Sequence, residues 1–202
     1  MASPEIIART GQCDWMLMTA IHDALRRDLD QLLQTTASRA AARTRWRVFS
    51  GQLRFHLATE ETVMWRPARA RLAGDPDGLA LLDAMEDEHR LISLLQAVTD
   101  DAFIMDADPS RPRQLLTRLR TRLTSHLAHE ETDALPLISQ IMTRRELTAI
   151  DRAVRGGTGA RHPAGTVPWA LAGATPAVCQ QVCSQLPIPA RLLYRALWLP
   201  RY

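Results

Sequence analysis

A seven-residue segment with a histidine and two glutamates occurs twice in the chain. Residues 56–62 read HLATEET and residues 126–132 read HLAHEET, so six of seven positions match. In a helix, side chains four positions apart lie about 40° apart around the axis and about 6 Å apart along it. His56 with Glu60, and His126 with Glu130, would each present an imidazole nitrogen and a carboxylate oxygen in one direction. Such mixed donors are typical of a metal site.

Four long amphipathic helices are predicted to position these side chains, because apolar residues recur three and four positions apart. Each apolar stripe is interrupted by one histidine, and the second and fourth stripes also contain Glu60 and Glu130. The chain therefore resembles a duplicated helical hairpin. The expected helices cover 14–37, 42–72, 78–104 and 109–141, and their histidines are His22, His56, His89 and His126. Pro67 is expected to kink or end the second helix near Arg66.

The predicted fold class is all-α, an antiparallel up-down four-helix bundle with short connections. Thr143 and Glu146 have the spacing of a capping box, which predicts a short fifth helix to about Arg155. The remaining sequence is proline-rich and contains no acidic residue. We expect two domains: 1–155 as the bundle, and 156–202 as a C-terminal extension that packs on it. The extension should contain two short helices, one opened by Thr175-Pro176 and one at about 189–199.

A single histidine on an apolar stripe is most simply a core residue with one hydrogen bond. Four such histidines together with two inward carboxylates favour metal binding instead, because buried unpaired carboxylates destabilise a core and no arginine neighbours them on the stripes. Six ligands suit two metal ions, each with two histidines, bridged by the two carboxylates and by an oxo, hydroxo or water ligand. The donors suit iron or manganese. Which histidines share an ion stays open, and the additional candidate ligands are Glu86 and His129.

The arrangement of four stripe histidines and two His-x-x-x-Glu segments resembles the hemerythrin-like, or HHE cation-binding, domain over roughly residues 14–141. The extension is similar to those of some bacterial members. The resemblance implies a non-haem di-iron centre, in which manganese or zinc could replace iron. It also implies the following ligands: His22, His56, His89 and His126 as terminal ligands, and Glu60 and Glu130 as bridges.

The sequence departs from the oxygen-carrying hemerythrins at two positions. Those proteins have a further histidine one turn after the third-helix histidine, where this chain has Ser93. They also place the fourth-helix carboxylate five residues after its histidine, which would select Glu131, whereas the stripe and the match to Glu60 favour Glu130. Without this histidine, the two metal ions would have similarly open coordination. Such a pair is less suited to reversible oxygen carriage, which requires one nearly saturated and one open iron.

Three functions follow from this interpretation. The first is an enzyme that binds and turns over hydrogen peroxide, O2 or nitric oxide in oxidative or nitrosative stress defence. The second is a non-catalytic sensor or storage module for O2 or iron, although no output domain is recognised in this sequence. The third is a purely structural bundle without a functional metal.

Composition narrows the partners and the location. The first 151 residues carry 19 Arg against 22 acidic residues, which is unlike a nucleic-acid-binding domain. No apolar stretch reaches the roughly 18–20 residues of a membrane span, and the N-terminus is unlike a secretory signal, so a cytoplasmic protein is expected. The basic extension could contact a second copy of the chain or a membrane surface. Cys179 and Cys183, four residues apart, could pack, bind metal or respond to oxidation.

Overall fold

The computed structural model describes residues 15–34, 38–105, 110–155 and 166–184, and every regular element within these ranges is helical. This confirms the expected all-α class. The elements are α2 (Met16–Gln34), α3 (Arg39–Glu60), η1 (Glu61–Trp65), α4 (Arg66–Arg71), α5 (Pro76–Met105), α6 (Ser110–His129), η2 (Glu130–Ala134), α7 (Leu135–Ile141), α8 (Arg144–Arg155), α9 (Thr166–Leu171) and α10 (Pro176–Ser184).

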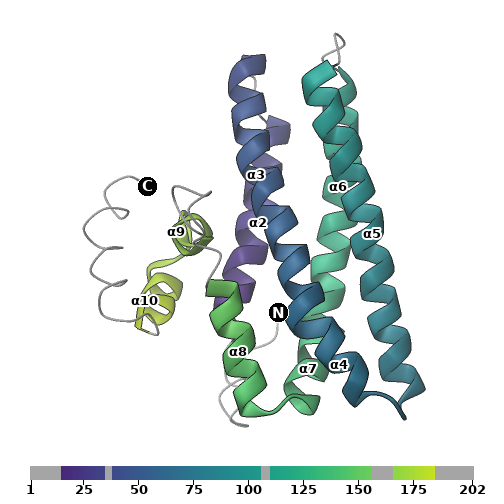
Figure 1. Cartoon of the computed structure of the whole chain (residues 1–202). Helices are drawn as coiled ribbons and strands as arrows, with labels where there is room; N and C mark the ends of the chain where they lie inside the picture. The colour runs from purple at the N-terminus through teal and green to yellow at the C-terminus, as the bar shows by residue number, and fades with distance from the viewer. Residues whose placement is uncertain (1–14, 35–37, 106–109, 156–165, 185–202) are drawn as a thin grey trace.

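The long helices α2, α3, α5 and α6 lie side by side as a bundle (Figure 1). Contacts join α2 to α3, α3 to α5, α5 to α6 and α6 to α2, so the four enclose a common interior. The residues that fill this interior belong to the predicted stripes, among them Leu25, Leu53, Leu82 and Leu119, all fully buried. Burial of these apolar faces stabilises the helices, since tertiary packing of an apolar face contributes most of the stability of helices in proteins.

Two short π-helices interrupt the second and fourth helical segments. The Arg66 N–H donates to the carbonyl of Glu61, and the Leu135 N–H donates to the carbonyl of Glu130; both bonds span five residues. A proline follows each π-turn, in the first turn of α4 or α7. Proline has no N–H, and its ring would clash with the carbonyl four residues earlier in a regular helix. The expected break at Pro67 therefore begins earlier, directly after Glu60, and the chain remains helical across it.

Helix α8 begins at the predicted capping box. The backbone N–H of Thr143 donates to Glu146 Oε2 (2.8 Å), and the Glu146 N–H donates to Thr143 Oγ1 (3.3 Å). Arg71, at the end of α4, donates to Glu146 Oε1 (2.8 Å). The same carboxylate therefore caps one helix and ties it to another.

The described part of the extension packs on α2. The indole N–H of Trp169 in α9 donates to Asp28 Oδ2 (2.7 Å), and Arg27 donates to the carbonyls of Trp169 and Ala172. Gly173, with a φ of 80°, ends the segment in a conformation that favours glycine. Helix α9 was not predicted, and the expected helix at about 189–199 lies outside the described residues. The start of α10 at Pro176 agrees with the prediction.

Two further sequence-based expectations concern the membrane and the cysteines. A membrane-spanning helix is absent from the described ranges. Cys179 and Cys183 lie on α10, and neither belongs to a group of side chains that could hold a metal among the described residues.

We expect Glu146→Gln to lower the melting temperature at neutral pH, because it weakens the capping box and the contact with Arg71. Hydrogen bonds from Thr143 and Arg71 hold the pKa of Glu146 at about 2, below its ordinary value of 4.5. The carboxylate's contribution is therefore complete above pH 4.5 and is lost as the pH falls toward 2. Thermal melts across this range should show the difference between variant and wild type shrinking. A difference that does not change with pH would contradict this account.

Candidate metal centre

The six predicted ligands all lie in the interior of the bundle. His22 comes from α2, His89 from α5, and the two repeated segments supply the other four at the ends of α3 and α6. Exposed fractions range from 0% to 7%, with His89 the most exposed. One π-turn begins directly after Glu60, and the other begins at Glu130. Such π-turns within α-helices are frequently found at functional sites.

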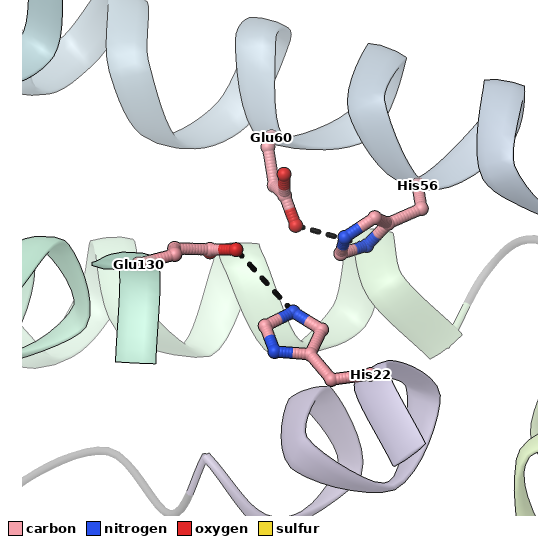
Figure 2. Close-up of side chains that lie close together, drawn as sticks. All are labelled: His22, His56, Glu60 and Glu130. Carbon is pink, nitrogen blue, oxygen red and sulfur yellow. Dashed lines mark ion pairs between the residues drawn. The ribbon is translucent and has the colours of Figure 1, made fainter. Parts of the chain in front are cut away.

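The ligand atoms form two groups that share one residue. His22, His56, Glu60 and Glu130 have ligand atoms within 4.8 Å of one another, and Glu60, His89 and His126 form the second group. Figure 2 shows the first group, with side chains from three segments converging on one point. The structure therefore groups His22 with His56 and His89 with His126, an assignment that the sequence left open.

Glu60 lies between the two groups. Its Oε1 is 2.9 Å from His56 Nδ1, and its Oε2 is 3.3 Å from His89 Nε2. Each carboxylate oxygen thus faces an imidazole of a different group, which is the arrangement required of a bridging carboxylate. Glu130 Oε2 approaches His22 Nε2 at 3.3 Å (Figure 2).

Two acidic residues outside the groups orient ligand histidines. His22 Nδ1 is 2.7 Å from Glu131 Oε1, which also accepts from Arg26 at 2.9 Å. His126 Nδ1 is 2.8 Å from Glu88 Oε2. An N–H at Nδ1 leaves the Nε2 lone pair available for a cation, and carboxylates commonly orient metal-binding histidines in this way.

The Nε2 atoms of His89 and His126 face each other at 3.1 Å. Two imidazole lone pairs at this distance repel unless a proton or a cation lies between them. Because the Nδ1 atom of His126 is engaged by Glu88, its Nε2 atom is the acceptor of that ring. The pair is thus suited to a shared cation.

Several buried polar atoms of the centre have no hydrogen-bond partner. They are both carboxylate oxygens of Glu60, both carboxylate oxygens of Glu130, His22 Nε2 and His56 Nε2. An unsatisfied buried polar group costs about 1–3 kcal/mol, and more when it is charged. The orphaned atoms are all electron-pair donors, so a metal cation would satisfy them together. The residues present therefore fit the metal ions that the family resemblance implies.

The pKa values of the two buried glutamates shift in opposite directions. Burial raises both, but the imidazoles of His56 and His89 outweigh it at Glu60 and hold its pKa well below the usual range. At Glu130, burial and then the charge of Glu60 raise the pKa well above its ordinary value. Burial beside the charge of Glu60 thus disfavours ionisation of the Glu130 carboxyl when no cation is present. Bound metal would remove this conflict.

The additional candidate ligands lie outside both groups. Glu86 pairs with Arg69 at 2.7 Å on the surface side of α5. His129 is 2.9 Å from Glu88 Oε1 and is about one-third exposed. Glu88 was missed because no stripe contains it, although its position directly before His89 turns it toward α6.

Glu131 lies beside the centre but outside both groups. Burial raises its pKa, but hydrogen bonds from His22 and Arg26 outweigh this effect and hold the value at about 2. The structure places Glu130, the residue that the apolar stripe selected, in the first group, and Glu131 in neither group. The sequence offered no sign that Glu131 would bind the Nδ1 side of a ligand histidine.

Comparison with known families agrees with this site. Residues 15–138 match the hemerythrin HHE cation-binding domain, which spans α2 to α7 and all six grouped side chains. Searches of curated proteins and of solved structures found no match. The chain belongs to the hemerythrin HHE cation-binding domain family.

Proposed function

We propose that the bundle, with its four long helices in an up-down order, holds two non-haem iron ions. His22, His56 and Glu130 would hold one ion, His89 and His126 the other, and Glu60 would bridge them. Glu130, which the sequence suggested as a second bridge, lies in the first group only. The observation that carries this proposal is the position of Glu60, whose two buried oxygens each face a histidine of a different group without a hydrogen bond.

The donor set favours iron or manganese over a structural zinc ion. Structural zinc sites are closed, four-coordinate and commonly contain thiolates, whereas these groups contain only imidazole and carboxylate donors. Bound iron would supply one-electron and O2 chemistry. The protein would bind and turn over a small oxidant, namely hydrogen peroxide, O2 or nitric oxide, in oxidative or nitrosative stress defence. The six side chains would fill only part of the coordination spheres of two iron ions. The remaining positions leave room for such a small ligand, which supports this function.

The alternative is a sensor or storage module for O2 or iron that does not turn its ligand over. Both functions require the metal centre, so peroxide consumption by the iron-loaded protein distinguishes them. Turnover that disappears in His56→Ala and His126→Ala supports the enzyme. Stoichiometric ligand binding without turnover supports the module.

Metal content is the first test. We expect about two irons per chain by elemental analysis, since six donors exceed the four of a tetrahedral ion. The optical spectrum should contain an oxo-bridge absorption band that disappears on anaerobic reduction and changes on peroxide addition. A protein that contains only zinc and is inert to peroxide would rule out the enzyme.

Glu60→Gln should reduce the metal content to one ion or fewer per chain, because an amide cannot bridge two cations as a carboxylate does. The matched control is Glu61→Gln, which changes the adjacent glutamate outside both groups. Elemental analysis and far-UV circular dichroism on the two variants separate loss of ligation from loss of fold. Equal metal content in both variants would argue against a bridging role for Glu60.

Glu130→Gln should stabilise the metal-free protein and destabilise the metal-loaded protein at pH 7. In the metal-free form the variant removes a carboxyl group whose pKa burial and Glu60 raise above 4.5, and each pKa unit corresponds to about 1.4 kcal/mol. In the loaded form it removes a ligand. Urea denaturation with and without a chelator measures both effects.

Glu131→Gln is the control variant, for which we expect the opposite change in the stability of the metal-free protein. Hydrogen bonds from His22 and Arg26 depress the pKa of Glu131 to about 2, so its carboxylate stabilises the fold near neutral pH. Its removal should therefore destabilise the metal-free form, unlike that of Glu130. The same sign in both variants would contradict the assignment of the two glutamates.

A further inference from the structure

The two groups of the metal centre contain unequal numbers of protein ligands. Four side chains converge at His22 and His56, counting Glu60 and Glu130, whereas three converge at His89 and His126, counting Glu60. One helical turn after His89, where a side chain would point the same way, stands Ser93. Ser93 is exposed and is not one of the residue types that commonly bind such metals. The His89–His126 side therefore has the less complete set of protein ligands.

The group with fewer protein ligands is also the more accessible of the two. A pocket with a volume of about 400 Å³ opens over His89 and is lined on α3 by Ala58 and on α5 by Ser93. We call it the His89 pocket. His89 is also the most exposed of the six grouped side chains. This pocket thus reaches from the surface to a ligand residue of the less complete group.

The His56 side is closed by comparison. The cavity that His56 and Glu60 line has a volume of about 10 Å³, and Val154 of α8 and Thr166 of α9 also line it. A cavity needs roughly 10–15 Å³ to hold one water molecule. The C-terminal helices therefore leave little more than the space of one water on this side of the centre.

A buried donor without an acceptor also lies near His89. The Trp65 ring centroid is 6.1 Å from that of His89, and the indole Nε1 is buried without a hydrogen-bond partner. An unsatisfied buried N–H destabilises the protein until a polar group reaches it. The indole N–H of Trp65 is thus a further unsatisfied polar group in the neighbourhood of His89.

The charges at the mouth of the His89 pocket balance, so they do not attract ligands of one sign. Two guanidinium groups and two carboxylates line it, from Arg54, Arg90, Glu61 and Glu86. Both arginines have acidic partners, Arg54 with Asp100 at 2.9 Å and Arg90 with Asp87 at 2.6 Å. Steering of charged ligands requires a field of one sign. Size and access, and not charge, would therefore select the ligand.

We propose that the His89 pocket is the route by which a small ligand of two or three atoms reaches the metal pair, and that the ligand binds on the His89–His126 side. This inference rests on the proposed metal centre. It assigns to Ser93 the role of leaving a coordination position open, and to Ala58 the role of leaving the pocket passable.

The first test is Ser93→His, studied as azide binding to the oxidised, iron-loaded protein. A histidine four residues after His89 points the same way and can occupy the open position. We expect the azide dissociation constant, measured from the azide-dependent absorption band, to rise about tenfold or more. Iron content should stay at that of the wild type. Ser93→Ala is the matched control and should bind azide like the wild type.

The second test does not depend on a new ligand. Ala58→Trp places a large side chain at the lining of the His89 pocket, and Ala128→Trp places the same side chain at the equivalent exposed position of the other repeat. In stopped-flow mixing, Ala58→Trp should slow azide association about tenfold or more relative to Ala128→Trp. Both variants should retain iron.

The outcomes separate this inference from the proposed function. If the wild-type chain binds no iron, the metal centre itself is refuted. If it binds two irons but both tryptophan variants react at the same rate with azide, the His89 pocket is not the route. If Ser93→His retains its iron and binds azide as tightly as the wild type, the ligand binds elsewhere. A Ser93→His protein that does not fold leaves the tryptophan pair as the deciding comparison.

Discussion

The carboxylate of Glu60, buried between imidazoles that come from two different helices, is the constraint on which the rest of the structure depends. A carboxylate in this position cannot be solvated, and neither of its oxygens has a hydrogen-bond partner. The surrounding bundle keeps it there, since Glu60 is fully buried, as are Leu53 and Leu82 on the stripes of α3 and α5. The interior is thus organised around a charge that a cation would balance.

Other features near the centre position the histidine side chains around that carboxylate. The π-turns accommodate Pro67 and Pro136 without ending the helices, so side chains on both sides of each turn stay attached to one continuous segment. Glu131 and Glu88 bind the Nδ1 atoms of two histidines and direct the opposite nitrogens inward. Helix α9, fixed to α2 by Trp169, covers the side of the centre next to His56.

Much of the fold and the grouped side chains could be predicted because both depend on periodicity. Helical spacing alone brings His56 above Glu60, and the same spacing selects Glu130 over Glu131. What could not be predicted depends on contacts between segments. The approach of Glu88 to His126 and the docking of Trp169 on Asp28 join residues whose proximity no local pattern encodes. Helix α9 was missed because it is short and contains Pro168 in its first turn.

The hydrogen bonds that lead outward from His126 and from His22 end in different types of side chain. From His126 the contacts pass through Glu88 to His129, whose side chain is about one-third exposed. From His22 they pass through Glu131 to Arg26, which keeps its charge. The contacts that leave the centre therefore end in an imidazole on the His126 side and in a guanidinium on the His22 side. The two flanks of the bundle thus present different chemical groups next to the solvent.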